Sequence, residues 1–268
     1  MHLVVISHYA SRSIVNLQKI VAQVLFSTPG IEIEVCIVAN VEPAVESLSE
    51  ATIRISDAIN GTIEALSGSG DFDSNKKLPR IHIHTRQNSG MNIGAWDHGW
   101  RIQPSFDTYL FIQDEVIILK ENWYSAFLDK ASNILDTSTP FLIGETWNSH
   151  WQRSWESLRN SRQNYDIDVG GATAPRVDYY LYHFKKWGID YLDHGGHLRS
   201  LVWFTDKSTL ERIGGFPVGR DYHECIASEI SVSVKVRSIG GSTMQLRDLP
   251  FAYIWHPEWR RNGISKLQ

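Results

Sequence analysis

The sequence has little cysteine. Its 268 residues include two, Cys36 and Cys225, and these form no CxxC pair. This content favours a reducing compartment over a disulfide-stapled secreted fold. Cys36 lies in an apolar run, where a reduced thiol behaves as a small hydrophobic side chain. We therefore expect a core thiol at Cys36 and a cytoplasmic protein.

Long apolar runs and an excess of positive charge are also missing. No window approaches the roughly 18 apolar residues of a membrane-spanning helix. The opening MHLVVISHYASR places no basic region ahead of its short apolar stretch, unlike a signal peptide. The formal net charge of −4 argues against nucleic acid as the main partner. We expect no transmembrane segment, and we leave open a peripheral association with a membrane or a partner enzyme.

The chain does contain an alternation of apolar runs and segments with helical spacing. Its 42% hydrophobic and 21% charged residues are typical of a globular protein. This rhythm is typical of a single α/β domain, residues 1–268, with an open, mostly parallel sheet flanked by helices. Ligands bind such sheets beyond the carboxyl ends of the strands. In the first half, strands are predicted at 3–7, 32–38, 81–84 and 108–112, and helices at 14–26, 47–66 and 92–101.

The second half has a less regular pattern, and glycine pairs close two of its helices. It also contains a polar candidate helix, 151–164, and a candidate flexible loop, 169–175. The remaining predicted elements are helices at 123–136, 207–213 and 229–239 and strands at 141–144 and 201–205.

Two segments carry residues suited to a phosphorylated ligand. RQNSGMNIGAWDHGW places Asn88, Gly90 and Gly94 where a strand turns into a helix. A ligand can approach the backbone closely there, although an ordinary turn with tight helix packing explains the glycines equally well. TYLFIQDEV ends an apolar strand in Asp114 and Glu115. Carboxylates at this position can hold Mg²⁺ or Mn²⁺ on a diphosphate, and a plain surface loop is the alternative.

A third segment, SEISVSVKVRSIGG, contains Glu229, which we expect near the start of a helix. A carboxylate there is stabilised by the helix dipole alone. It can also serve as a general base that removes a proton from an acceptor hydroxyl.

Together and in this order, the segments resemble the family 2 glycosyltransferases and the wider class with the nucleotide-diphospho-sugar transferase fold, called GT-A. The stretch Asn88–Gly99 is similar to the family's "N.G...A.N.G" pattern, and QDEV to its acidic "DDDV". IGGF at 213–216 is similar to "vGGFde", and SEISVSVKVRSIGG to "EDVDLSLRLRRAGY". The resemblance runs from Leu3 to Gly241. It implies one GT-A domain with a nucleotide-sugar-binding half, 1–115, and an acceptor-binding and catalytic half, 116–268.

The resemblance also implies roles for single residues. Glu115 takes the place of the last acid of the family's DxD motif, a metal ligand, and His256 that of a late histidine that completes the metal site. Glu229 falls on the catalytic base. Arg199, in LDHGGHLRS, suits either the diphosphate or a loop near the acceptor. The donor-binding candidates lie at the matching strand ends and turns, with this arginine added: Ser7, Asn40, Asn88, Gly90, Gly94, Gln113, Asp114 and Arg199.

The expected activity is transfer of a sugar from a nucleotide-diphosphate sugar to a hydroxyl of a glycan or glycolipid acceptor. By resemblance it is an inverting transfer assisted by Mn²⁺ or Mg²⁺, in the synthesis of a surface polysaccharide. Gln113 replaces the first acid of the motif, and VANVE at 38–42 replaces "VDDGS". These departures favour an alternative, a non-catalytic module that binds glycan or a partner in a polysaccharide-assembly complex. A nucleotidyltransferase needs a Gly- and Arg/Lys-rich loop after the first strand, where HYASRSIVN offers only Arg12.

Aromatic residues and histidines outside these motifs have two interpretations each. The ten tryptophans suit both a core and a sugar-binding surface, and core packing accounts for more than half of them. The segment DYYLYHFKKWGIDY, 178–191, suits an acceptor platform or a dimer contact. His82 and His84 share one face of a strand, as half-exposed strand residues do.

Overall fold

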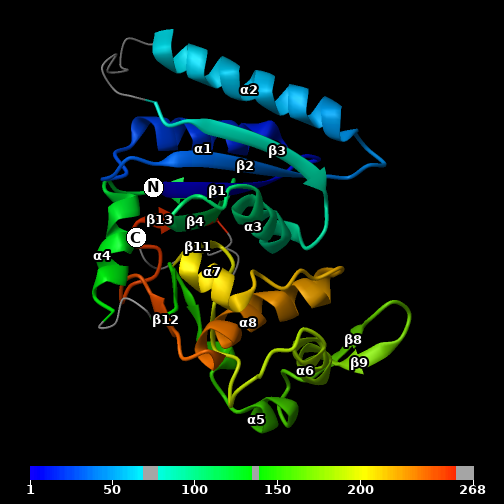
Figure 1. Ribbon diagram of the computed structural model, residues 1–268. Helices are drawn as coiled ribbons and strands as arrows, with labels where there is room; N and C mark the ends of the chain where they lie inside the picture. The colour runs from blue at the N-terminus through cyan, green and yellow to red at the C-terminus, as the bar shows by residue number, and fades with distance from the viewer. Residues whose placement is uncertain (69–77, 135–138, 258–268) are drawn as a thin grey trace.

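The computed structural model describes residues 1–68, 78–134 and 139–257, with a seven-stranded sheet at its centre (Figure 1). The strands are β1 His2–Tyr9, β2 Glu34–Val41, β3 Ile81–Gln87, β4 Thr108–Gln113, β6 Phe141–Gly144, β11 Val202–Asp206 and β12 Ser242–Gln245. Their order is β12-β6-β11-β4-β1-β2-β3. All neighbours run parallel except β11, which is antiparallel to both β4 and β6. The expected mostly parallel α/β sheet is therefore confirmed.

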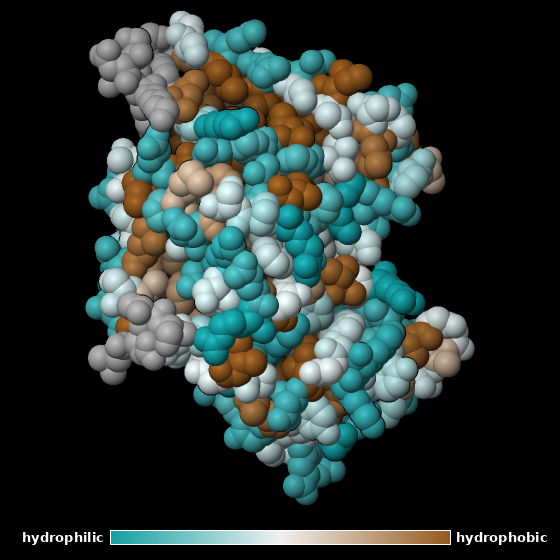
Figure 2. Space-filling view, viewed as in Figure 1, coloured by the Kyte–Doolittle hydropathy of each residue, from teal (hydrophilic) through white to brown (hydrophobic). Residues whose placement is uncertain are grey.

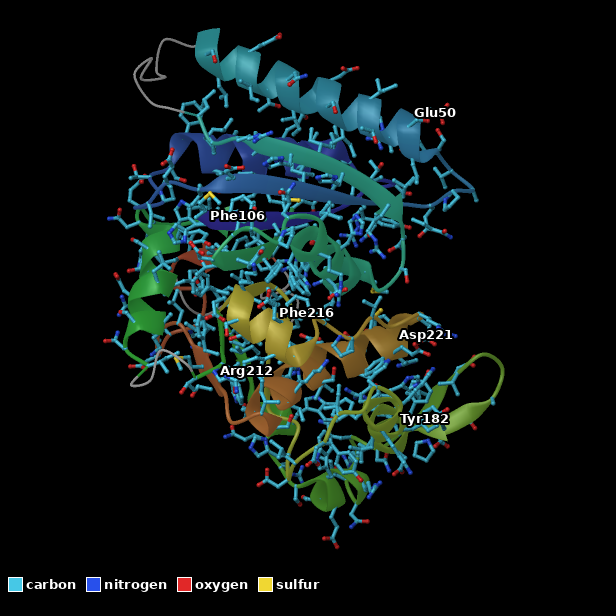
Figure 3. The ribbon with its side chains drawn as sticks, in the orientation of Figure 1. Glu50, Phe106, Tyr182, Arg212, Phe216 and Asp221 are labelled. Atoms are coloured by element: carbon cyan, nitrogen blue, oxygen red, sulfur yellow. The ribbon has the colours of Figure 1, made fainter. Side chains whose placement is uncertain are left out.

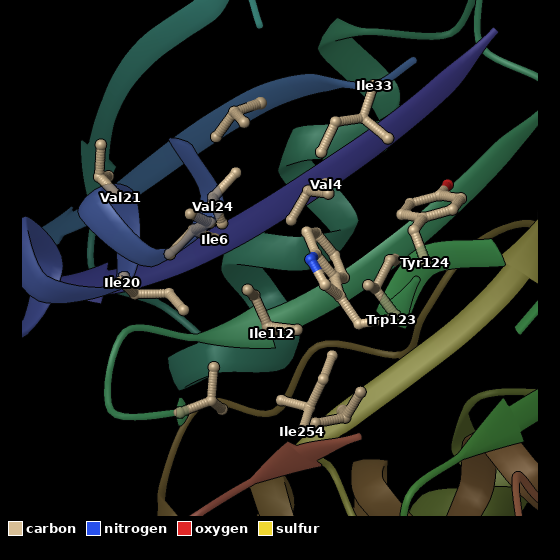
Figure 4. Close-up of a cluster of buried hydrophobic side chains, with 14 of the residues drawn as sticks. Val4, Ile6, Ile20, Val21, Val24, Ile33, Ile112, Trp123, Tyr124 and Ile254 are labelled. Carbon is tan, nitrogen blue, oxygen red and sulfur yellow. The ribbon is translucent and has the colours of Figure 1, made fainter. Parts of the chain in front are cut away.

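Helices cover both faces of this sheet, because each central strand is apolar on both sides. In β1, Val4 and Ile6 join the cluster under one set of helices, and Leu3 and Val5 join the cluster under the other. Figure 4 shows the first cluster, with Val4 and Ile6 packed among helix side chains that include Trp123. The first face is covered by α1 Ile14–Phe26, α2 Leu48–Gly68 and α4 Trp123–Ser132, and the second by α3 Met91–Ile102, α7 Lys207–Ile213 and α8 Tyr222–Ser238.

A third cluster lies away from the sheet, where α5 Trp155–Arg159 and α6 Arg176–Lys186 pack against α8 (Figure 1). Trp151 and Trp155 are buried in it. Tyr180 and Phe184 of the segment 178–191 are buried in the same cluster, whereas Tyr182 is exposed. The short elements are β5 Ile117–Ile118, β7 Trp147–Asn148, the 3-10 turn η1 Ser149–Trp151, β8 Asp166–Asp168, β9 Thr173–Pro175, β10 His197–Leu198 and β13 Ile254–Trp255.

Several sequence-based boundaries need correction. Residues 169–175 belong to a β8–β9 hairpin, whose turn uses Gly170 and Gly171 at φ of +73° and +90°. The helix predicted over 151–164 is reduced to η1 and α5, and the helix predicted over 123–136 ends at Ser132. The end of that prediction, like most of the polar loop after α2, lies outside the described residues.

Cys36 and Cys225 are both buried free thiols, and burial raises the pKa of each to about 12. Each therefore stays protonated and behaves as an apolar side chain at neutral pH. Within the part of the chain that the structure describes, no helix combines the length and apolarity needed to cross a bilayer.

Candidate active site

Gln113, Glu115 and His256 meet just beyond the carboxyl end of β4. The imidazole Nε2 of His256 lies 3.3 Å from the Gln113 amide oxygen and 3.8 Å from Oε2 of Glu115. The Gln113 amide nitrogen donates to the Ser200 carbonyl at 2.7 Å, which turns its oxygen toward the histidine. His256, far from the other two in sequence, thus brings an imidazole nitrogen close to an amide oxygen and a carboxylate oxygen.

A buried carboxylate fixes the segment that carries His256. Glu145, 1% exposed, accepts backbone N–H bonds from Ala252, Tyr253 and Ile254 at 2.8 to 3.0 Å. Ile254 and the following residue also pair with β5 as strand β13. Burial raises the pKa of Glu145 to about 7, against the opposing effect of the three N–H bonds. This clamp sets where His256 lies.

The two acids after β4 face different ways. Oδ2 of Asp114 lies 2.5 Å from Nδ1 of His8, and both side chains are buried. Glu115 is partly exposed and accepts a bond from Arg12 at 2.7 Å. Asp114 is therefore engaged inside the molecule, whereas Glu115 faces the open edge of the sheet. The sequence analysis did not single out His8 as a partner of Asp114.

The ends of β1 and β2 are tied down by side chains predicted to contact the donor. The Asn40 amide donates to the Met91 carbonyl at 2.8 Å and accepts from Arg86 at 2.9 Å. Asn88 donates to Glu42 at 2.7 Å. Ser7 is buried, and its hydroxyl lies 3.4 Å from the backbone oxygen of Ile112. In this structure these side chains are engaged in contacts within the chain.

Gly90 and Gly94 are required by packing at the start of α3. Gly90 has φ of +75°, a backbone conformation that side chains other than glycine rarely adopt, and a Cβ there would lie 2.3 Å from Val218. A Cβ on Gly94 would lie 1.9 Å from the Ser89 carbonyl oxygen. The tight-packing interpretation therefore accounts for both glycines without a ligand.

Ser200 links Glu229 to the end of β4. Its N–H donates to Oε1 of Glu229 at 2.7 Å, and its carbonyl accepts from Asn92 at 2.6 Å as well as from Gln113. Glu229 does not open a helix, because α8 begins at Tyr222 with Asp221 as its cap. The helix dipole at an N-terminus therefore does not explain Glu229, and the carboxylate is instead held by a specific backbone bond.

A pocket of about 310 Å³ extends from this linkage. One wall is a single face of α8, since Tyr222, Cys225, Ile226 and Glu229 follow helical spacing. Asn92, Gln113 and Arg199 line the end near Glu229, and Trp151 and Arg176 also line the pocket. Figure 3 marks Asp221 at the first turn of α8 and Tyr182 on the adjacent α6. Figure 2 shows the outline of the molecule notched on the right, between the sheet half and the β8–β9 hairpin.

A larger hollow of about 840 Å³ lies at the opposite edge of the sheet, among Met1, Glu34 and residues 78–80. It faces the starts of β1, β2 and β3, and α/β sheets bind their ligands at the strands' carboxyl ends. The smaller pocket lies at that end and is lined by Asn92, Gln113 and Glu229, so we place the candidate site there.

Glu115, His256 and Gln113 suit a hard divalent cation only if a bound diphosphate supplies further oxygen ligands. Among residues 1–68, 78–134 and 139–257 there is no group of three or more His, Cys, Asp or Glu side chains suited to a metal. Glu115, His256 and Gln113 supply one carboxylate, one imidazole and one amide oxygen. Mn²⁺ or Mg²⁺ accepts these ligands when diphosphate oxygens and water complete the coordination.

The histidines of β3 lie away from this site. His82 pairs with Glu34 at 2.7 Å, and burial lowers the pKa of His84. Both are partly buried strand residues, as expected.

Comparison with known proteins identifies the fold. No protein-family model matches the chain, and no curated protein matches it by sequence. Among solved structures, the mannosyltransferase PcManGT from Pyrobaculum calidifontis, in complex with GDP-Man and Mn²⁺, aligns with a TM-score of 0.51 at 10% identity. The alignment covers 92% of this chain and 55% of the mannosyltransferase, so this chain spans about half the length of that enzyme.

Two further structures are more distant. The bifunctional glycosyltransferase WbbM in its apo form aligns with a TM-score of 0.45 at 10% identity, over 87% of this chain and 36% of that one. A 1–349 fragment of S. aureus TarS aligns with a TM-score of 0.46 at 12% identity, over 95% and 60%. The strand order, the antiparallel β11 within a parallel sheet and the likeness to the mannosyltransferase show that this chain has the GT-A glycosyltransferase fold, in a strongly divergent sequence.

Proposed function

We propose that the protein transfers a sugar from a nucleotide-diphosphate sugar to a hydroxyl group of a glycan or glycolipid acceptor. The observation that carries the proposal is the Ser200 linkage, which joins Glu229 to Gln113 and so to His256 and Glu115. A candidate base and a candidate leaving-group site thus lie on either side of one loop. The mannosyltransferase of the same fold, solved with GDP-Man and Mn²⁺, supports this class of donor.

The donor site is built mainly from residues 1–115, with Arg199 and His256 added from the second half of the chain. Glu115 and His256 would hold a divalent metal, which would supply positive charge to the diphosphate when bound. Gln113 orients His256, and Arg199 provides a further positive charge near Ser200. Asn40, Asn88, Gly90 and Gly94 position the backbone beneath the nucleotide, and Ser7 and Asp114 anchor β1 to β4.

Residues 116–268 supply the base and the acceptor wall. Glu229 takes the proton of the acceptor hydroxyl, whose oxygen forms a bond to the anomeric carbon as the bond to the diphosphate oxygen breaks. By resemblance to the family 2 glycosyltransferases, this is a single displacement that inverts the anomeric configuration, with Glu229 as the one base. The Ser200 N–H fixes the Glu229 carboxylate at the edge of the pocket. A surface polysaccharide is the acceptor class that we propose, in the cytoplasm and with peripheral association to a membrane or partner enzyme.

The base is tested with Glu229→Gln, which keeps an oxygen for the Ser200 N–H. We expect sugar transfer to fall at least about 100-fold, as for the loss of a general base, while nucleotide affinity stays within about twofold. Glu224→Gln on the same helix is the control. Glu224 accepts a bond from the Arg220 backbone N–H and is not among the residues that line the pocket. Transfer by Glu229→Gln at the wild-type rate would show that the base is misassigned.

A non-catalytic module is the second candidate. It is favoured by Gln113 in place of an acid and by the Arg12 guanidinium that already pairs with Glu115. This candidate predicts glycan binding without metal-dependent binding of any nucleotide.

A further inference from the structure

Arg176 is a charged residue of the pocket that the proposed transfer does not use. It begins α6 and lines the pocket together with Trp151 and Tyr222. Its guanidinium carbon lies 4.8 Å from the ring centre of Trp151, 5.0 Å from that of Tyr165 and 5.6 Å from that of Tyr180. Three aromatic side chains thus surround one cation.

The hydrogen bonds of Arg176 go to neutral partners. Its Nε donates to the Tyr180 hydroxyl and its Nη1 to the Tyr165 hydroxyl, both at 3.1 Å. Burial raises the pKa of Tyr180 to about 12, so this hydroxyl carries no charge at neutral pH. Across the described part of the chain, no carboxylate lies within ion-pair distance of Arg176, whereas Arg159, on the neighbouring α5, pairs with Asp178 at 2.6 Å. The guanidinium is ordered, but its charge is not neutralised.

The pocket as a whole has a positive balance. Its charged lining residues among those described are Arg176, Arg199 and Glu229. His197 adds no charge, because burial lowers its pKa to about 3. Arg199 is adjacent to Ser200 and so lies at the Glu229 end, where the proposed function assigns it to the donor diphosphate.

Arg176 lies toward the other end of the pocket. Three residues further along α6, the Tyr179 hydroxyl donates to Asp221, the cap of α8, at 3.4 Å, so the start of α6 lies at the start of α8. Tyr222 and Glu229 stand on one face of α8, separated by about two helical turns, on the order of 10 Å. This spacing is longer than one pyranose ring, so a group at the Tyr222 end would belong to the sugar next to the one whose hydroxyl lies at Glu229.

We propose that Arg176 is an acceptor-recognition residue, and that it binds an anionic group, a carboxylate or a phosphate, carried on the acceptor sugar next to the one that bears the attacked hydroxyl. This inference rests on the proposed glycosyltransferase function and narrows its acceptor to an acidic glycan. The pre-ordered guanidinium has N–H donors left for a bidentate contact with such an anion. An acidic sugar would therefore bind the Arg176 guanidinium, whose side chain is already held by two tyrosine hydroxyls.

The test compares three probes by NMR titration of the full chain: glucuronic acid, glucose 6-phosphate and glucose. The signal of the Arg176 Nε–H group reports contact. We expect at least one acid to bind about tenfold or more tightly than glucose and to shift this signal, as expected for a charge-assisted hydrogen bond. A response to glucuronic acid alone identifies a carboxylate, and a response to glucose 6-phosphate alone identifies a phosphate.

Variants separate recognition from folding. Arg176→Gln should bind the acids no better than glucose, and Arg176→Lys should keep part of the preference because it keeps the charge. Arg153→Gln is the matched control, since Arg153 is exposed, lies two positions after Trp151 and bonds to Ser157 away from the pocket lining. It should leave all affinities unchanged. If Arg176→Gln does not fold, the preference retained by Arg176→Lys decides the question.

Two results would overturn the inference. The first is equal binding of the acids and glucose by the wild-type chain. The second is loss of nucleotide affinity together with acid affinity in folded Arg176→Gln, which would assign the arginine to the donor. Nucleotide titration of the wild-type chain distinguishes failure of the acidic-acceptor inference from failure of the proposed glycosyltransferase function. Nucleotide binding without acid preference rejects only the acidic acceptor, and acid binding without nucleotide binding rejects only the transfer.

Discussion

At the scale of single residues, Asp114 and Glu115 are neighbours in the sequence with opposite surroundings. The side chains of Asp114 and its partner His8 are 7% and 0% exposed, whereas those of Glu115 and Arg12 are 22% and 58% exposed. A buried polar pair is costly to break, because the remaining partner stays desolvated. An exposed ion pair contributes little, because water screens it.

The two acids should therefore respond differently to amide substitution. Asp114→Asn should lower the free energy of unfolding by about 1–3 kcal/mol, and Glu115→Gln by less than about 1 kcal/mol. The order should reverse for Mn²⁺-dependent nucleotide affinity, which Glu115→Gln should weaken at least about tenfold through the loss of a carboxylate ligand. Urea unfolding and calorimetric titration measure the two effects. Equal stability losses would contradict the assignment of Asp114 as the interior acid.

Glu145 gives the protein a pH-dependent stability. Its pKa rises from the ordinary value of 4.5 to about 7 in the fold, chiefly through burial. Between these values the folded carboxyl keeps a proton that the unfolded one has released, so the free energy of unfolding falls as pH rises from about 4.5 to 7. The full shift corresponds to a change on the order of 3 kcal/mol.

We predict that Glu145→Gln flattens this slope, because the amide does not titrate. Urea unfolding of both proteins at several pH values between 4.5 and 7 measures it. If the variant keeps the wild-type slope, another group causes the pH dependence.

At the scale of secondary-structure elements, the turn from β3 into α3 depends on glycines that have no room for a side chain. Gly94→Ala should lower the free energy of unfolding by about 1–3 kcal/mol or more, because its methyl group meets the Ser89 carbonyl. Gly61→Ala, inside α2 with no atom within 4 Å of the new Cβ, should raise it by about 0.5–1 kcal/mol. Thermal unfolding of the two variants should therefore shift in opposite directions. If Gly61→Ala is also destabilised, the loss of stability in Gly94→Ala cannot be assigned to the contact with the Ser89 carbonyl.

Elements with a simple apolar period were predictable from the sequence. The bounds of α1, α7 and β6 match the predictions, because their apolar residues follow one clear spacing and end at glycine, proline or polar residues. The start of α8 was wrong by seven residues. Glu224, Ser228 and Ser231 are buried positions of this helix. Because these buried residues are polar, the sequence shows no clear apolar period over the first turns of α8. The β8–β9 turn carried a recognisable signal in its Gly-Gly pair.

The candidate site was predictable only in part. Strand ends locate residues such as Gln113, Glu115 and Asn40, because the order of strands and helices fixes which ends share an edge. Contacts between distant segments carry no local signal, and these decide the rest. The backbone of Ser200 holding Glu229, and tyrosines surrounding Arg176, depend on how loops pack.

At the scale of the whole molecule, the pocket forms where the two halves of the chain meet. The end of β4 and the start of α3 come from residues 1–115, and α6 and α8 come from residues 116–268. The GT-A fold places these parts around the carboxyl edge of the sheet, at the notch seen in Figure 2. The central claim is that this edge binds a nucleotide diphosphate together with a divalent metal.

The decisive experiment is a titration of the full chain with UDP, GDP, CMP and dTDP, each with and without Mn²⁺. We expect one diphosphate to bind, Mn²⁺ to strengthen its binding, and Glu115→Gln to remove the effect of the metal. If no nucleotide binds, with or without Mn²⁺, the edge is not a donor site, and the non-catalytic module becomes the better explanation of the fold.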